Sequence, residues 1–168
     1  MNCGDCLTDV SVSRVTDMAG MFWNASNFTS DLSSWNVERV EHMKRMFRGA
    51  SSLTSDLSSW NVERVTDMGW MFEGATAFNS DLSSWDVSRV ADMRYMFRRA
   101  ESFNVDLSGW NIGRALHLHG MFDGASSFEH DLCWDVPVSV WGFRAFTKDM
   151  FHNSPGSLKP ECTKDGEL

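Results

Sequence analysis

A ten-residue segment recurs four times at intervals of 25 residues, and this repeat restricts the chain to a small set of folds. DLSSWNVERV occupies residues 31–40 and again 56–65, followed by DLSSWDVSRV at 81–90 and DLSGWNIGRA at 106–115. A fixed period with the same apolar residues at every step is the signature of a solenoid, because one coil cannot bury its apolar side alone and stacked coils can. The sequence therefore predicts one solenoid rather than several independent domains.

The repeat also contains two charged ladders. The acidic ladder comprises Asp31, Asp56, Asp81, Asp106 and Asp131, and the basic ladder comprises Arg39, Arg64, Arg89 and Arg114, with Arg14 one step earlier. Carboxylates stacked at the ~4.8 Å spacing of adjacent strands repel one another. We therefore predict that backbone N–H groups in a turn, or the matching arginines, stabilise the acidic ladder, and that the two ladders are energetically coupled. A row of Ca²⁺ ions is the weaker alternative, because Ca²⁺ requires about six to eight oxygen ligands and each coil has one invariant carboxylate.

The apolar residues of one coil follow two local patterns. From Val65 they fall at 65, 68, 71, 72 and 75, which is helical spacing and predicts a helix over 64–73. The segment NSDLSSWDV at 79–87 predicts a short strand near 81–84. One strand and one helix per coil give an α/β fold: a leucine-rich-repeat-like right-handed solenoid of about five 25-residue coils, with short parallel strands on one face and short helices on the other.

Both ends of the chain depart from the repeat, as the caps of a solenoid do. The period fails after Trp134, although a Met-Phe pair returns at Met150 and Phe151. We expect a single solenoid domain over 1–168, with an N-terminal cap at 1–13, repeats at 14–136 and a C-terminal cap at 137–168.

The most regular stretch reads MFEGATAFNSDLSSWDVSRVADM, at 71–93. It resembles the repeat of the BspA-like bacterial surface proteins, a family with 26-residue repeats related to leucine-rich repeats. The likeness extends over roughly residues 14–136. The resemblance implies attachment or recognition rather than catalysis, and a location at the cell surface or outside the cell. It provides no functional residues to transfer to this chain.

Charge and hydropathy narrow the possible partners. A net charge of −8 argues against general binding to nucleic acid or to anionic membrane, which requires a basic surface. The chain has no run of 18 apolar residues, so we expect no membrane insertion. The N-terminal residues MNCGDCLTD do not form a signal peptide. The extracellular or cell-surface location is thus expected from the resemblance alone, in a chain that shows no signal peptide.

The four cysteines form two groups near opposite ends of the chain. In a solenoid these groups would lie ~24 Å apart, beyond the ~7 Å between Cα atoms that a disulfide permits. We therefore expect disulfides Cys3–Cys6 and Cys133–Cys162. Free thiols are one alternative, and a metal or redox site at the CxxC is another, although no second Cys or His pair completes a zinc site.

The histidines suggest no metal site. His42 and His117 share a repeat position three coils apart, and His117 and His119 would not face each other on a helix. We expect these three, with His130 and His152, to lie at a solvated surface. No nucleophile–base constellation, phosphate loop or convergent carboxylate pair stands outside the repeat. The sequence therefore predicts neither an enzyme nor a bound cofactor or metal.

Several residues on the expected helical side vary from coil to coil. The candidate partner-binding residues are Trp23, Lys44, Arg45, Arg48, Trp70, Arg94, Tyr95, Arg98 and Arg99. Exposed aromatic residues and arginines are typical of interaction hot spots. They predict a non-enzymatic recognition or cell-surface adhesion module that binds a protein or glycan, either as a monomer or with end-to-end self-association. The alternatives are a structural spacer or self-assembling solenoid, and an ice- or mineral-surface binder that uses the serine rows at 33–34, 58–59 and 83–84.

Overall fold

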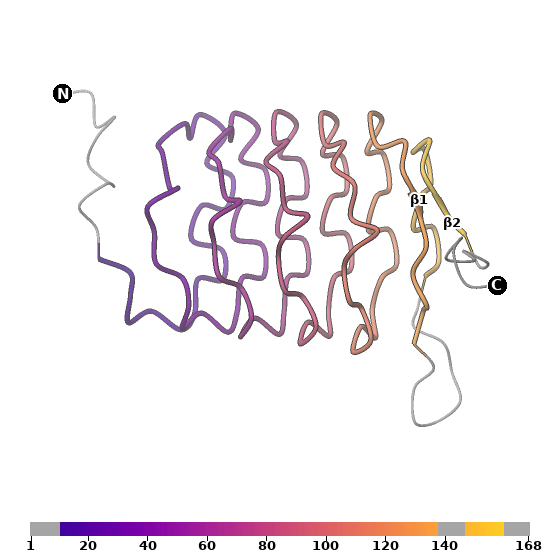
Figure 1. Ribbon diagram of the computed structural model, residues 1–168. Coiled ribbons are helices and arrows are strands. Elements are labelled where there is room, and N and C mark those ends of the chain that lie inside the picture. Colours follow the sequence, from indigo (N-terminus) through magenta and orange to yellow (C-terminus); the bar gives the residue numbers. More distant parts are fainter. Residues whose placement is uncertain (1–10, 138–146, 160–168) are drawn as a thin grey trace.

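The computed structural model describes residues 11–137 and 147–159, which wind into a stack of coils along one axis (Figure 1). Two short strands, β1 (Asp131–Leu132) and β2 (Ser157–Leu158), pair in parallel in the last coils, with Asp131 opposite Ser157. Isolated parallel bridges join the other coils in the order Asp17, His42, Asp67, Asp92 and His117. The repeated architecture predicted from the 25-residue period is confirmed, while the right-handed sense of the coils stays a prediction.

The segment expected to be helical, 64–73, forms a run of turns instead. Its amides alternate between two kinds of acceptor. The Met71 N–H donates within the coil to the Met68 carbonyl at 3.1 Å, whereas the Trp70 N–H donates to the Arg94 carbonyl of the next coil at 2.9 Å. The same alternation recurs along the stack, and the described part of the chain contains no helix. The predicted helical layer is therefore wrong.

The cause is a left-handed residue in each turn. Trp70 has φ 59° and Gly74 has φ 70°. L-residues adopt this conformation singly and not in succession, so an α-helix cannot extend through them. A four-residue turn with positive φ at its third residue has type II geometry. Helical spacing of the apolar residues arises here because consecutive turns also direct every third or fourth side chain inward.

The strand predicted near 81–84 is also a turn. The Trp85 N–H donates to the Leu82 carbonyl at 3.1 Å, and the Ser83 N–H donates to the Asp81 carboxylate at 3.0 Å. An Asp that accepts the amide two residues later closes a local turn in place of a strand ladder. The leucine-rich-repeat form of the fold, with a helix and a strand in each coil, is thus not confirmed.

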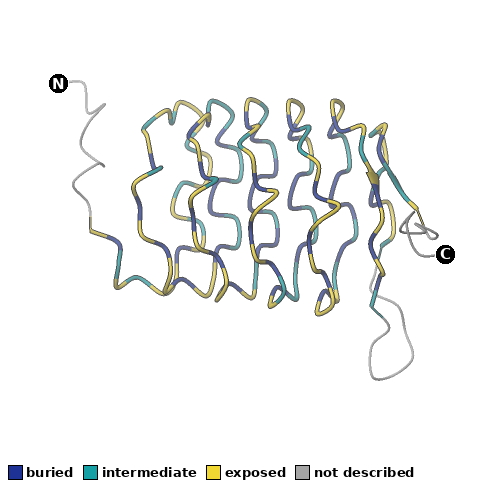
Figure 2. Cartoon of the chain, in the orientation of Figure 1, coloured by how far each residue is buried: buried dark blue, intermediate teal, exposed yellow. Residues whose placement is uncertain are grey.

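The core is a set of aromatic and methionine ladders inside the coils, and buried positions recur in every coil (Figure 2). The rings of Phe72 and Phe97 stack with centroids 5.6 Å apart, and Phe97 and Phe122 stack at 5.5 Å. A second ladder is formed by tryptophans, of which Trp60 and Trp85 stack at 6.5 Å. The regular ladders that the sequence predicted are therefore the buried contact between coils.

The buried tryptophans also have their polar atom satisfied. Four of them donate their indole N–H at 2.9–3.0 Å to a leucine carbonyl of the preceding coil. The pairs are Trp60 with Leu32, Trp85 with Leu57, Trp110 with Leu82, and Trp134 with Leu107. A buried Trp needs such a partner for its N–H, and the indole therefore fixes the register of adjacent coils.

The Met-Phe pair near the C-terminus adds a further coil. Met150 is buried, and the Phe151 ring stacks on Phe122 at 5.3 Å. The Phe122 N–H donates to the Met150 carbonyl at 2.8 Å, as in the regular coils. Residues 147–159 therefore repeat the coil within the segment that the sequence assigned to the C-terminal cap.

Candidate functional site

Eight of the nine candidate partner-binding residues contact one another on one side of the turns. We call this group the aromatic–cationic surface. It comprises Trp23, Lys44, Arg45, Arg48, Trp70, Arg94, Tyr95 and Arg98. The ninth residue, Arg99, lies over Gly124. The turns place these side chains together because they occupy equivalent positions in consecutive coils.

The centre of the surface is an arginine between two tryptophans. The Arg45 guanidinium carbon lies 5.9 Å from the Trp23 ring centroid and 4.9 Å from that of Trp70. Lys44 and Arg94 also lie over the Trp70 ring, at 5.2 and 5.3 Å. Cations within about 6 Å of an aromatic centroid are attracted by the ring quadrupole. Trp70 thus forms the junction of three cationic side chains.

The aromatic row continues through Tyr95. Its ring stacks on Trp70 at 5.8 Å and lies at right angles to the His119 ring at 4.9 Å. The ring covers Gly120, where an added Cβ would approach the Tyr95 Cε1 to 2.3 Å. Glycine at this position therefore leaves the space that the Tyr95 ring occupies.

Two acidic residues hold the arginines in place. Glu73, only 9% exposed, forms ion pairs with Arg48 at 2.6 Å and with Arg98 at 3.3 Å. Asp123 pairs with Arg98 Nε and with His152 Nδ1, both at 2.9 Å. Burial raises the pKa of Asp123, but the hydrogen bonds from His152 and Arg98 outweigh it, so the pKa lies below its ordinary value. Neither acid is among the candidate partner-binding residues predicted from the sequence, because both positions vary between coils as surface residues do.

A cavity of about 380 Å³ lies beside Tyr95. Its lining is Arg94, Tyr95, His117, His119, Lys148 and Asp149. Burial, then the charges of Arg94 and His117, lower the pKa of His119 below its ordinary value. The expectation that a helix keeps His117 and His119 apart is wrong, because His117 lies in a parallel bridge with Asp92 and His119 lies in the turn that follows. Both side chains are half-buried, and their ring centroids lie 6.2 Å apart.

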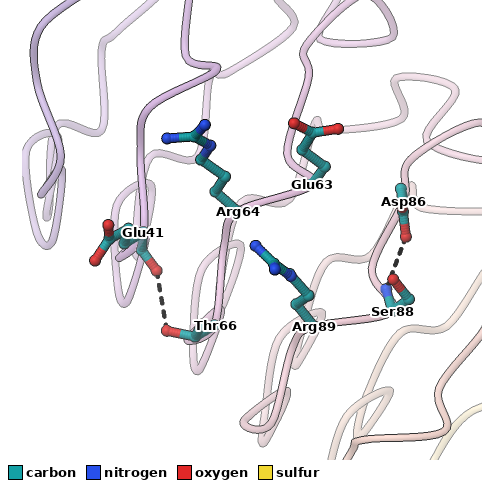
Figure 3. Close-up of a pocket in the computed structure, with 7 residues that line it drawn as sticks. All are labelled: Glu41, Glu63, Arg64, Thr66, Asp86, Ser88 and Arg89. Carbon is teal, nitrogen blue, oxygen red and sulfur yellow. Dashed lines mark hydrogen bonds between the residues drawn. The ribbon is translucent and has the colours of Figure 1, made fainter.

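The basic ladder lines a separate polar groove, which we call the arginine groove. One pocket of about 490 Å³ is lined by Glu41, Glu63, Arg64, Thr66, Asp86, Ser88 and Arg89. In Figure 3 the Arg64 and Arg89 side chains extend from adjacent coils in the same direction. A neighbouring pocket of about 420 Å³ shares Glu41, Glu63 and Arg64 and adds Arg39. Because acids line the groove together with arginines, it has no single charge sign.

The acidic ladder is held by serines. The Asp56 carboxylate accepts the Ser58 N–H at 2.9 Å and the Ser80 hydroxyl of the next coil at 3.1 Å, while Ser80 accepts the Leu57 N–H at 2.8 Å. The Ser58 backbone N–H, followed by the Ser58 and Ser80 hydroxyls, holds the pKa of Asp56 below its ordinary value. The predicted support from turn N–H groups is therefore present.

The predicted partnership between the two charged ladders is not seen. Among the ion pairs of the described residues, none joins an aspartate of the acidic ladder to an arginine of the basic ladder. The last member, Asp131, pairs instead with Lys159 at 3.2 Å. The turn satisfies the carboxylates locally, which leaves the arginines exposed along their groove.

Three further predictions from the sequence concern metal binding, membrane insertion and disulfides. In residues 11–137 and 147–159, no group of three or more His, Cys, Asp or Glu side chains could hold a metal ion. No helix in this part of the chain could cross a membrane. Each predicted disulfide, Cys3–Cys6 and Cys133–Cys162, includes at least one cysteine outside the described residues, so both pairings stay predictions.

The comparisons with known proteins give a family but no activity. A model of the family described as "Mycoplasma protein of unknown function, DUF285" matches twice, over residues 2–92 and 55–155. The two matches overlap, as expected for a repeat. No curated protein and no solved structure matches the chain. Because the matches together cover most of its length, the chain belongs to the DUF285 family.

Proposed function

We propose that this protein is a non-enzymatic recognition module that binds a protein or glycan through its aromatic–cationic surface. The observation that carries the proposal is the Arg45 guanidinium between the Trp23 and Trp70 rings. Trp, Tyr and Arg are the residues that dominate binding energy at interfaces. Trp23 is 51% exposed, so a partner can reach the ring directly.

Backbone strain at the same positions supports a binding role. Arg45, Trp70 and Tyr95 have φ of 58°, 59° and 55°, and glycine occupies the equivalent positions 20 and 120. Bulky residues rarely adopt positive φ, and such strain tends to gather at functional sites. Large side chains at three strained positions in the middle coils are consistent with selection for the surface that they form.

Prior ordering of the side chains would favour binding. Ordering a long side chain at an interface costs about 0.5–1.5 kcal/mol. The ion pairs of Glu73 with Arg48 and Arg98 already restrict both arginines before a partner arrives. A partner would therefore meet a surface whose rotamers are partly fixed.

The resemblance to BspA-like surface proteins supports the same proposal. We propose on that ground a location at the cell surface or outside the cell, and a kinship with leucine-rich-repeat solenoids despite the absence of helices from the described coils. Ice or mineral binding by the serine rows has weaker support. The Ser59 and Ser84 hydroxyls donate to the carbonyls of Ser33 and Ser58, so these hydroxyls already join coils.

The test is a binding screen of the purified chain against glycan arrays and extracellular-protein panels, followed by affinity measurement for each ligand found. Trp70→Ala should weaken binding by about 30-fold, the equivalent of ~2 kcal/mol at a hot spot. Arg89→Ala, in the arginine groove, and Leu116→Ala, at an exposed apolar residue, serve as matched controls. Equal losses in Trp70→Ala and in either control would contradict the proposal.

A further inference from the structure

The first coil presents an open face at one end of the described stack. Met21 is 45% exposed, whereas its ladder equivalents Met46, Met71, Met96 and Met121 are fully buried. Phe22 is likewise only partly buried, while the next ring of its ladder, Phe47, is fully buried. The apolar surface that each later coil buries against its predecessor is thus accessible here.

The same face has a row of carbonyl groups that accept no amide from the residues that the structure describes. In the regular coils the carbonyls at these positions accept amides of the preceding coil, as the Lys44 carbonyl accepts the Gly20 N–H at 2.9 Å. In the described part of the chain, no amide donates to the equivalent carbonyls of Ala19, Met21 and Trp23. Unpaired backbone groups at the edge of a regular array form a template for pairing with another chain.

The opposite end of the stack has the complementary groups. Amides equivalent to Asp149, Phe151 and Asn153 donate to the following coil throughout the stack, as Phe122 does to Met150 at 2.8 Å. These three amides have no acceptor among the described residues. Asp149 and Asn153 also share the positive φ of the repeat, at 54° and 56°. Residues 147–153 therefore form a coil of the regular type, and its outward amides have no acceptor within residues 11–137 and 147–159.

We propose that the protein self-associates head to tail, with residues 147–153 of one copy stacked on residues 17–23 of a second copy. The backbone would pair as it does between coils, and the phenylalanine ladder would continue from Phe151 to Phe22 of the next copy. The interface is heterologous, so that repeated association produces open filaments rather than closed dimers.

A charge pair supports this register. Lys44 forms an ion pair with Asp67 of the next coil at 3.5 Å. Lys148 occupies the position of Lys44 in the last coil, and Asp17 occupies the position of Asp67 in the first. Stacking in the same register therefore brings Lys148 of one copy to Asp17 of the next, with opposite charges facing each other.

Sedimentation velocity over a wide range of concentrations tests the proposal on the intact chain. The wild type should form species larger than its 19.1 kDa monomer, in proportions that increase with concentration. Met21→Arg should weaken association by about 100-fold, because stacking would bury an unpaired charge. The matched control Leu116→Arg changes an apolar residue of similar exposure away from the ends and should leave association unchanged.

A charge exchange tests the head-to-tail register itself. Asp17→Lys and Lys148→Asp should each weaken association about threefold to tenfold, since like charges then face each other. Both substitutions in one chain, or an equimolar mixture of the two single variants, should restore it. Both residues are exposed, and an unchanged thermal midpoint would show that the variants fold.

A monomer at every concentration would overturn the proposal, as would equal losses in Met21→Arg and Leu116→Arg. Failure of the charge exchange to restore association would exclude this register. These outcomes are separate from those of the recognition test, because Trp70→Ala alters the side of the stack and leaves both ends intact.

Discussion

The two sides of one coil follow different rules on the same backbone. On the buried side, phenylalanine and tryptophan repeat because each ring contacts its own kind in both neighbouring coils. On the aromatic–cationic side the equivalent positions hold Gly20, Arg45, Trp70, Tyr95 and Gly120, all with positive φ. The amide of each of these five residues donates to a carbonyl of the next coil. The contrast indicates that the ladders and amides specify the fold, which leaves the outer side chains available for binding.

The largest expected difference in stability is between substitutions of two tryptophans in one repeat unit. Trp85→Ala should cost ~3–5 kcal/mol, because it removes a buried ladder ring. Trp70→Ala should cost less than about 1.5 kcal/mol, because Trp70 is half-buried and its strained φ is no better suited to Trp than to Ala. Urea unfolding of both variants measures the difference. Similar losses would show that the outer side is also a core.

Two glycines of neighbouring segments provide a second contrast. Gly120→Ala should cost about 1–3 kcal/mol, because φ is 59° and the new Cβ would overlap the Tyr95 ring. Gly109→Ala should change stability by less than about 0.5 kcal/mol, since no atom lies within 4 Å of the new Cβ. Thermal unfolding of the two variants compares them. Combining Gly120→Ala with Tyr95→Ala should recover part of the loss, and no recovery would contradict the overlap.

The acidic ladder should respond to pH. The folded-state pKa of Asp56 lies below its unfolded value of ~3.9. Its contribution to stability is therefore present above that value and is lost as pH falls through the folded pKa. Ser80→Ala removes a donor and should raise the Asp56 pKa toward its ordinary value, measured by NMR titration of the carboxyl carbon. Asp106 is the internal control, and an equal rise there would argue against a local effect.

The smallest expected change in stability comes from substitution of an arginine in the basic ladder. Arg89→Ala should change the free energy of unfolding by less than about 0.5 kcal/mol, because its guanidinium is exposed in the arginine groove. A double-mutant cycle with Asp81→Asn should be additive within about 0.3–0.5 kcal/mol, since the Asp81 pKa is lowered by Ser83. A larger coupling energy would instead support the energetic coupling between the two ladders that the sequence predicted.

The sequence correctly predicted the structural features that depend on repetition. It did not predict the features that depend on the backbone dihedral angles of single residues. Stacked ladders such as Phe72 on Phe97 follow directly from the 25-residue period. The turns at Arg45, Trp70 and Tyr95 could not be predicted, because large L-residues rarely have positive φ and their apolar neighbours have helical spacing. Gly49, Gly74 and Gly124 provide a partial signal, since glycine readily adopts the positive φ of the left-handed turns in which they lie.

The candidate site was predictable in part for a related reason. Variation among identical ladders identified the residues of the aromatic–cationic surface, such as Trp23 and Trp70, without any knowledge of the turns. The roles of Glu73 and Asp123 depend on their contacts with Arg98, which only the three-dimensional arrangement reveals. The cavity beside His119 was missed because a helix was expected there, and a helix would have separated His117 from His119.

The alternating amides are the feature from which the rest of the structure follows, and one NMR measurement tests them directly. A scalar coupling across the hydrogen bond identifies the carbonyl that accepts the Trp70 amide. Coupling to the Arg94 carbonyl carbon is expected, because the Trp70 N–H donates to the next coil at 2.9 Å. Coupling to the carbonyl of Thr66, the i−4 acceptor of an α-helix, would contradict the coil of turns and restore the helical layer.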